Sequence, residues 1–144
     1  MPDPLLLLGQ GDFLSEYAAA LRVAEFYGVG VRRDGTQVFF EFKTPQGRFV
    51  ARLECGGYPA VAPDLVFLDP ETEAVSADRN HWPPGGAVLH HPDGWHVCIP
   101  GTRWFERTHR NRGTRKDRSF SRILEVLAVC CSGRAQGLMV GRRR

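Results

Sequence analysis

Two runs in which every second residue is apolar, joined by a short turn sequence, constrain the fold of this chain most strongly. Every second residue in 38–42 and in 49–53 is apolar, and Thr44-Pro45-Gln46-Gly47 lies between the two runs. Alternation with a period of two is typical of a strand with one buried face, and Pro and Gly between two such runs mark a turn. The sequence therefore predicts a β-hairpin with one face in the core.

Weaker patterns on either side of the hairpin predict further elements. Residues 28–33 have the pattern of a preceding strand, and residues 65–68 that of a following one. The approach to this last strand, residues 58–63, contains prolines that hold it extended and outside a central ladder. Apolar residues at spacings of three and four predict a first helix over residues 12–27. The chain thus opens as a helix followed by an antiparallel meander.

A second helix is predicted after a basic loop at residues 103–118. Either Asp117 or Ser119 can cap it. Its apolar face is formed by Phe120, Ile123, Leu124, Leu127 and Cys131. Residues 69–104 show little periodicity and most of the unusual side chains, which is typical of a functional loop. We therefore expect an α+β fold with an N-terminal helix, a four-stranded antiparallel meander, a long active-site loop and a second helix.

Length and composition are those of one globular domain. The chain has 144 residues, of which 42% are apolar and 24% charged, so we treat 1–144 as a single domain. The longest aliphatic run, residues 5–8, is far too short to span a membrane, and no basic residue precedes it as in a signal peptide. We expect a cytoplasmic protein that meets no membrane. The pattern assigns no element to residues 133–144.

The net charge of +3 conceals an asymmetry along the chain. Residues 1–99 contain 7 Lys and Arg against 13 Asp and Glu, whereas residues 100–144 contain 12 against 3. A strongly basic C-terminal third indicates either an acidic partner surface or nucleic acid, and composition does not choose between them.

Side chains with catalytic chemistry gather around Cys98. The four cysteines of the chain have neither the spacing of a disulfide framework nor a CxxC motif. Cys98 lies in a stretch rich in proline and glycine, and His91, Asp93 and His96 come shortly before it. A nearby imidazolium lowers the pKa of a thiol and favours the nucleophilic thiolate. This pattern predicts a nucleophilic cysteine.

Two other interpretations of these residues remain open from residue types alone. Cys98 can be a buried packing thiol with surface histidines around it, because free cysteine is among the most buried side chains. Alternatively, His90 or His91 could bind zinc together with His96 and Cys98. No fourth ligand stands at a usual spacing, which makes the zinc site the weakest of the three.

Five motifs follow one another in a recognisable order. They are Tyr58-Pro59-x-x-Ala62-Pro63, His91-Pro92-Asp93, Val97-Cys98-Ile99, Trp104, and Ser119-Phe120-x-x-Ile123-Leu124-x-x-Leu127. This series resembles the ubiquitin-conjugating (UBC-like) family over roughly residues 12–131, and most of all its compact bacterial members in ubiquitin-like conjugation pathways.

The resemblance implies a UBC-like fold and a transferase activity. Cys98 would accept a ubiquitin-like protein as a thioester from an adenylating activating enzyme, and would pass it to an amine on a target protein. Neither a metal nor an organic cofactor is implied. His91 would hold the turn or transfer a proton, and His96 would lower the pKa of the Cys98 thiol.

The chain departs from the family pattern at Asp93, where the family has Asn, and Asp93 lies closer to Cys98 than usual. An ionised Asp cannot donate a hydrogen bond to an oxyanion, although it can orient or deprotonate the attacking amine. Asp93 also favours an alternative function, that of a catalytically inactive UBC-like adaptor.

The residues after Cys98 are candidates for partner binding. Trp104 can anchor a partner, and Arg103, Arg107 and Arg110 can dock an acidic surface of the activating enzyme, the ubiquitin-like protein or the target. Nucleic-acid binding through this basic third is the further alternative, but no recognised nucleic-acid motif accompanies the charge.

Overall fold

The structure, a computed structural model, describes residues 11–83, 88–91, 94–108 and 118–131. The elements in chain order are α2 (Gly11–Tyr27), β1 (Gly30–Asp34), β2 (Gln37–Thr44), β3 (Gly47–Glu54), β4 (Asp64–Leu68), the 3-10 helix η1 (Arg79–His81), β5 (Val88–His91), β6 (Gly94–Val97), α3 (Arg103–Thr108) and α4 (Phe120–Cys131).

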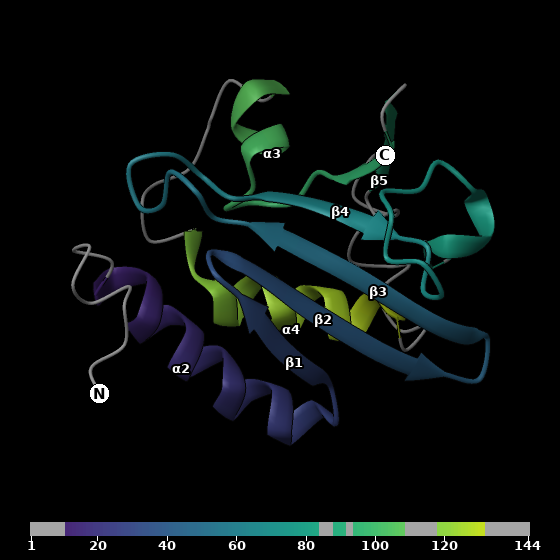
Figure 1. Ribbon diagram of the computed structural model, residues 1–144, viewed down its shortest axis with the longest axis horizontal. Coiled ribbons are helices and arrows are strands. Elements are labelled where there is room, and N and C mark those ends of the chain that lie inside the picture. The colour runs from purple at the N-terminus through teal and green to yellow at the C-terminus, as the bar shows by residue number, and fades with distance from the viewer. Residues whose placement is uncertain (1–10, 84–87, 92–93, 109–117, 132–144) are drawn as a thin grey trace, which may run out of the picture.

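The predicted four-stranded meander is confirmed as strands β1 to β4. All neighbouring strands pair antiparallel, and their order in the sheet is β1-β2-β3-β4-β6-β5 (Figure 1). The predicted hairpin turn closes where Thr44 pairs with Gly47. Thr44 Oγ1 accepts a hydrogen bond from the Gln46 amide at 3.1 Å, and Gly47 has a φ of 137°, which other residues rarely adopt. The turn sequence therefore fixes the register of β2 against β3.

The sheet has six strands rather than the expected four. Residues 69–104, which we expected to contain little regular structure, include a second hairpin made of β5 and β6. Strand β6 joins the sheet beside β4 through the pair Val66 and His96. The hairpin was missed because each strand has only four residues and takes its place from pairing with β4, which lies far away in the sequence.

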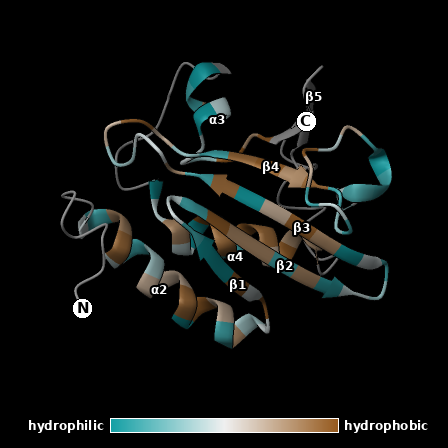
Figure 2. Cartoon of the chain, viewed as in Figure 1, coloured by the Kyte–Doolittle hydropathy of each residue, from teal (hydrophilic) through white to brown (hydrophobic). Residues whose placement is uncertain are grey.

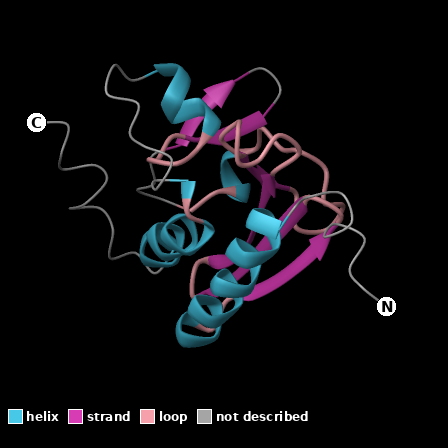
Figure 3. Ribbon diagram, turned by 90° about the vertical axis from the view of Figure 1, so that its left-hand side faces the viewer, coloured by secondary structure: helices cyan, strands magenta, loops and turns pink. Residues whose placement is uncertain are grey.

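Helices α2 and α4 lie side by side and cover one face of the sheet (Figure 3). The alternating residues of the hairpin, such as Phe40 and Leu53, are buried on that face together with apolar residues of both helices. The rings of Phe13 and Phe120 meet edge to face with centroids 5.6 Å apart. This layer of apolar side chains is the core. No helix in the described ranges is long and apolar enough to span a membrane.

Both predicted helices are confirmed, and the end of α2 and the start of α4 are capped. Helix α2 ends in a Schellman motif, in which Gly28 has a φ of 70° and the Val29 amide donates to the Ala24 carbonyl at 2.9 Å. At the start of α4, Ser119 Oγ accepts from the Arg122 amide at 3.3 Å. Glu16 of α2 accepts from the Phe120 amide at 3.0 Å, which links the two helices at their ends.

Candidate functional site

Cys98 differs from the other three cysteines in its exposure. Cys55, Cys130 and Cys131 are buried, whereas Cys98 is partly exposed. Burial raises the pKa of the Cys130 thiol to about 11, and it raises the pKa of the Cys55 and Cys131 thiols still further. These three thiols are therefore protonated packing groups at neutral pH. Cys98 is the cysteine that a reagent or a partner can reach.

The chain holds Cys98 at the point where β6 leaves the sheet. Its neighbours Val97 and Ile99 are both buried in the main core, to which Cys98 does not belong. The flanking side chains thus anchor the backbone on both sides of the thiol. Pro100 and Gly101 follow, and Gly101 has a φ of 98°, which requires a residue without a side chain to make the turn.

The buried side chain of Thr102 stabilises this turn by hydrogen bonds. The side chain is fully buried, and Oγ1 lies 2.8 Å from the carbonyl oxygen of Ile99 and 3.0 Å from that of Val97. The hydroxyl donates to this pair of carbonyls, which lie on either side of Cys98. The same oxygen caps α3, because it accepts from the Phe105 amide at 3.4 Å. One buried hydroxyl therefore connects the Cys98 turn to the helix that follows it.

The two histidines predicted to lie near Cys98 are at opposite ends of the β5–β6 hairpin. His96 lies in β6, two residues before Cys98, and pairs with Leu89. His91 pairs with Gly94 at the far end of the same hairpin. Three residues of strand separate that end from Val97, which corresponds to about 10 Å of backbone. His96 is therefore two residues from Cys98 along the chain, whereas the backbone of His91 lies at the other end of the hairpin.

Two predicted site residues, Asp93 and Arg110, lie outside the described residues. The alternative zinc site would use the imidazoles of His90, His91 and His96, and the structure does not describe these side chains. Where side chains are described, no group of three His, Cys, Asp or Glu gathers as metal ligands.

The first part of the predicted basic loop is helical, because Arg103–Thr108 forms α3. Helix α3 packs against residues 59–63, the proline-rich approach to β4. The Arg103 amide donates to the Pro63 carbonyl at 2.7 Å, and Arg103 Nε donates to the Ala62 carbonyl at 3.2 Å. Trp104 is partly buried in this helix, whereas Arg107 is exposed.

An ion pair that the sequence did not predict completes this corner. Arg118 donates from Nε and Nη2 to the two carboxylate oxygens of Glu106, each at 2.8 Å. Its Nη1 also donates to the carbonyls of Pro59 and Ala60 at 2.6 and 3.2 Å. Hydrogen bonding to Glu106 raises the pKa of Arg118 above its ordinary value. Arg118 therefore binds α3 and residues 59–60 to the beginning of α4.

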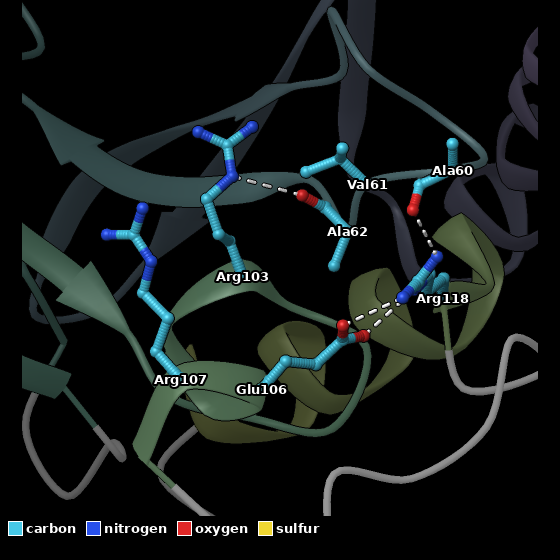
Figure 4. Close-up of a pocket in the computed structure, with 7 residues that line it drawn as sticks. All are labelled: Ala60, Val61, Ala62, Arg103, Glu106, Arg107 and Arg118. Atoms are coloured by element: carbon cyan, nitrogen blue, oxygen red, sulfur yellow. Dashed lines mark hydrogen bonds and ion pairs between the residues drawn. The ribbon is translucent and has the colours of Figure 1, made fainter.

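These contacts leave a pocket between α3 and the approach to β4, with a volume of about 390 Å³ (Figure 4). Its lining residues are Ala60, Val61, Ala62, Arg103, Glu106, Arg107 and Arg118. The sequence predicted Arg103 and Arg107 for partner binding, and both line this pocket. Glu106 and Arg118 were missed as a pair because they are twelve residues apart, although Glu106 is one of only two acids in the basic stretch 103–118.

Comparison of the chain with models of protein families finds no family that matches it. A search of curated proteins likewise finds no similar sequence.

Proposed function

We propose that this chain is a UBC-like transferase that carries a ubiquitin-like protein as a thioester on Cys98. The observation that carries the proposal is the setting of Cys98, a partly exposed thiol on a braced turn at the end of a sheet strand. A nucleophilic thiol must be accessible to its substrate and held in a fixed position, whereas a packing thiol need not be accessible. The order of helix, meander, cysteine turn and second helix is also the order that the family resemblance implies.

The proposed reaction has two transfer steps. The Cys98 thiolate attacks the carbonyl carbon of the thioester that joins the ubiquitin-like protein to its activating enzyme. A new C–S bond forms, and the thiolate of the activating enzyme leaves and takes up a proton. An amine of the target protein then attacks the Cys98 thioester, an amide bond forms, and the Cys98 thiol is regenerated. ATP is consumed earlier, by the adenylating enzyme, so this chain needs no cofactor for either step.

The residues before Cys98 have different roles in this proposal. His96, two residues before Cys98 along the chain, would lower the pKa of the Cys98 thiol when its imidazole is charged. His91, at the other end of the β5–β6 hairpin, would hold the turn. Asp93 orients or deprotonates the attacking amine, because an ionised carboxylate cannot donate to an oxyanion.

The test is thioester formation on the purified chain. The protein is incubated with ATP and with the activating enzyme and ubiquitin-like protein of its own pathway, and the products are separated on a non-reducing gel. We expect a larger species that reductant removes, that is missing in Cys98→Ala, and that persists in the matched control Cys130→Ala. In Cys98→Ser the species should resist reductant, because an oxygen ester replaces the thioester.

The competing function is that of an inactive UBC-like adaptor, which Asp93 in place of Asn favours. If the activating enzyme forms its own thioester but Cys98 is never charged, the transferase proposal is wrong and the adaptor takes its place. Nucleic-acid binding predicts a different result, namely salt-dependent binding of an oligonucleotide of arbitrary sequence.

A further inference from the structure

The pocket beside α3 contains two arginines whose charge no described residue neutralises. Arg103 and Arg107 are four residues apart and therefore lie on the same side of the helix (Figure 4). Among the described side chains, neither guanidinium has an acidic partner within salt-bridge distance. Within the described part of the chain, the Arg103 side chain donates only from Nε, toward the Ala62 carbonyl, so its two terminal nitrogens have no acceptor there.

The acid in the pocket does not neutralise them. Both carboxylate oxygens of Glu106 accept from Arg118, and the two side chains are mostly buried around this contact. Glu106 and Arg118 therefore cancel each other, and the pocket keeps the two positive charges of Arg103 and Arg107. Two like charges at this spacing repel each other along the helix.

The geometry of Arg103 suits the capture of an oxyanion. Its backbone amide and Nε are both fixed to residues 62–63, so the position of the guanidinium plane is set before any ligand arrives. A guanidinium held in this way offers its terminal N–H groups as a pair, which matches the two oxygens of a carboxylate. Less side-chain entropy is lost on binding when the donor is already ordered.

The pocket is also lined by the apolar residues Ala60, Val61 and Ala62, and Val61 is 46% exposed. A free inorganic anion would leave this apolar lining in contact with water. A peptide with an acidic residue beside an apolar one could make both kinds of contact. Its carboxylate would bind the arginines, and its apolar side chain would pack against Val61.

We propose that this pocket is a subsite for an acidic, partly apolar peptide segment of a protein partner, whose carboxylate Arg103 and Arg107 bind. The proposal deepens the proposed function and rests on it for one point only, that the bound partner takes part in transfer at Cys98. Thr102 supports this connection, because it caps α3 and also hydrogen-bonds on both sides of Cys98. A segment bound at α3 is thus attached to the same rigid unit as the thiol.

The test is direct binding of a blocked peptide to the full chain carrying Cys98→Ala, which removes thiol chemistry. The probe is a fluorescent hexapeptide that contains two glutamates, one on each side of a leucine. Its affinity is measured by fluorescence anisotropy. We expect Arg107→Gln to weaken binding about tenfold, the size expected from losing one charge-assisted hydrogen bond. Arg122→Gln is the matched control, because Arg122 is an exposed arginine on α4 outside the pocket, and its affinity should stay within about twofold of the parent.

Three further measurements decide the occupant. The same peptide with glutamines in place of glutamates should lose most of its binding, and inorganic phosphate at equal concentration should not displace the acidic peptide. Equal weakening by Arg107→Gln and Arg122→Gln, or displacement by phosphate or by a single-stranded oligonucleotide, would overturn the proposal. Charging of Cys98 is measured separately with the parent chain. A chain that is charged but does not bind the peptide contradicts only the subsite, and one that binds but is never charged contradicts only the transferase.

Discussion

The helix-covered core and the corner around α3 are held together by different forces. In the core, apolar side chains of the sheet and of α2 and α4 pack with almost no exposure. In the corner, hydrogen bonds join α3 to residues 62–63, and the ion pair of Glu106 with Arg118 joins α3 to the beginning of α4. Figure 2 shows the contrast, since α4 is largely hydrophobic and α3 largely hydrophilic.

The difference separates two tasks. Burial of apolar surface is large and non-directional, so it stabilises the sheet and its helices without fixing any one polar group precisely in space. Hydrogen bonds contribute less free energy each, but they depend on distance and angle. We infer that the core provides most of the stability, and that the corner fixes the geometry around Cys98 and the pocket.

The largest expected difference between the two regions is in thiol reactivity. Iodoacetamide should label Cys98 at least about 10³-fold faster than Cys131, because Cys131 is reached only when a domain with about 5 kcal/mol or more of stability unfolds. Peptide mapping by mass spectrometry measures both rates, and Cys98→Ala should leave the folded chain almost unlabelled. Comparable labelling of Cys131 would mean that the core opens as readily as the corner.

The next effect concerns stability and contrasts Phe67 in the core with Val61 in the pocket wall. Phe67→Ala should lower the free energy of unfolding by about 3–5 kcal/mol, because Phe67 is fully buried and its loss leaves a cavity. Val61→Ala should change it by less than about 0.5 kcal/mol, because Val61 is nearly half exposed. Urea denaturation followed by circular dichroism gives both values. Equal costs would show that the pocket wall is part of the core after all.

A smaller loss of stability than that of Phe67→Ala tests the role of Thr102. Thr102→Val keeps the shape but removes the hydroxyl, which leaves the carbonyls of Val97 and Ile99 without this donor. We expect a loss of about 1–2 kcal/mol in the same urea experiment. The labelling rate of Cys98 should change while that of Cys131 follows only the lower global stability. An unchanged Cys98 rate would contradict the idea that Thr102 holds the turn.

The sequence was sufficient for elements whose pattern is local. The alternation in residues 38–53 predicted β2 and β3, and the spacing in residues 12–27 predicted α2 to within a residue. Both follow from which residues face the core, and a period of two or of 3.6 reveals that directly.

The elements around the candidate site could not be predicted in this way. Strands β5 and β6 depend on pairing with β4, and α3 has only six residues, which is too short for a periodic pattern. Cys98 could be predicted as a candidate nucleophile because cysteine chemistry is suggested by one residue and its sequence neighbours. The link between Glu106 and Arg118 depends on the folded chain bringing two distant residues together, so only the structure reveals it.

Strand β1 has a further consequence for the behaviour of the protein in solution. It is the end strand of the described sheet, so its outer edge has backbone groups that a second chain could pair with. Arg32 and Arg33 lie at its centre. A copy pairing antiparallel about Arg32 would bring like charges directly opposite one another, which is unfavourable. Chain-to-chain growth of the sheet from this edge, the route to fibrous aggregates, is therefore disfavoured, although the ion pair of Arg32 with Glu73 offsets part of the repulsion.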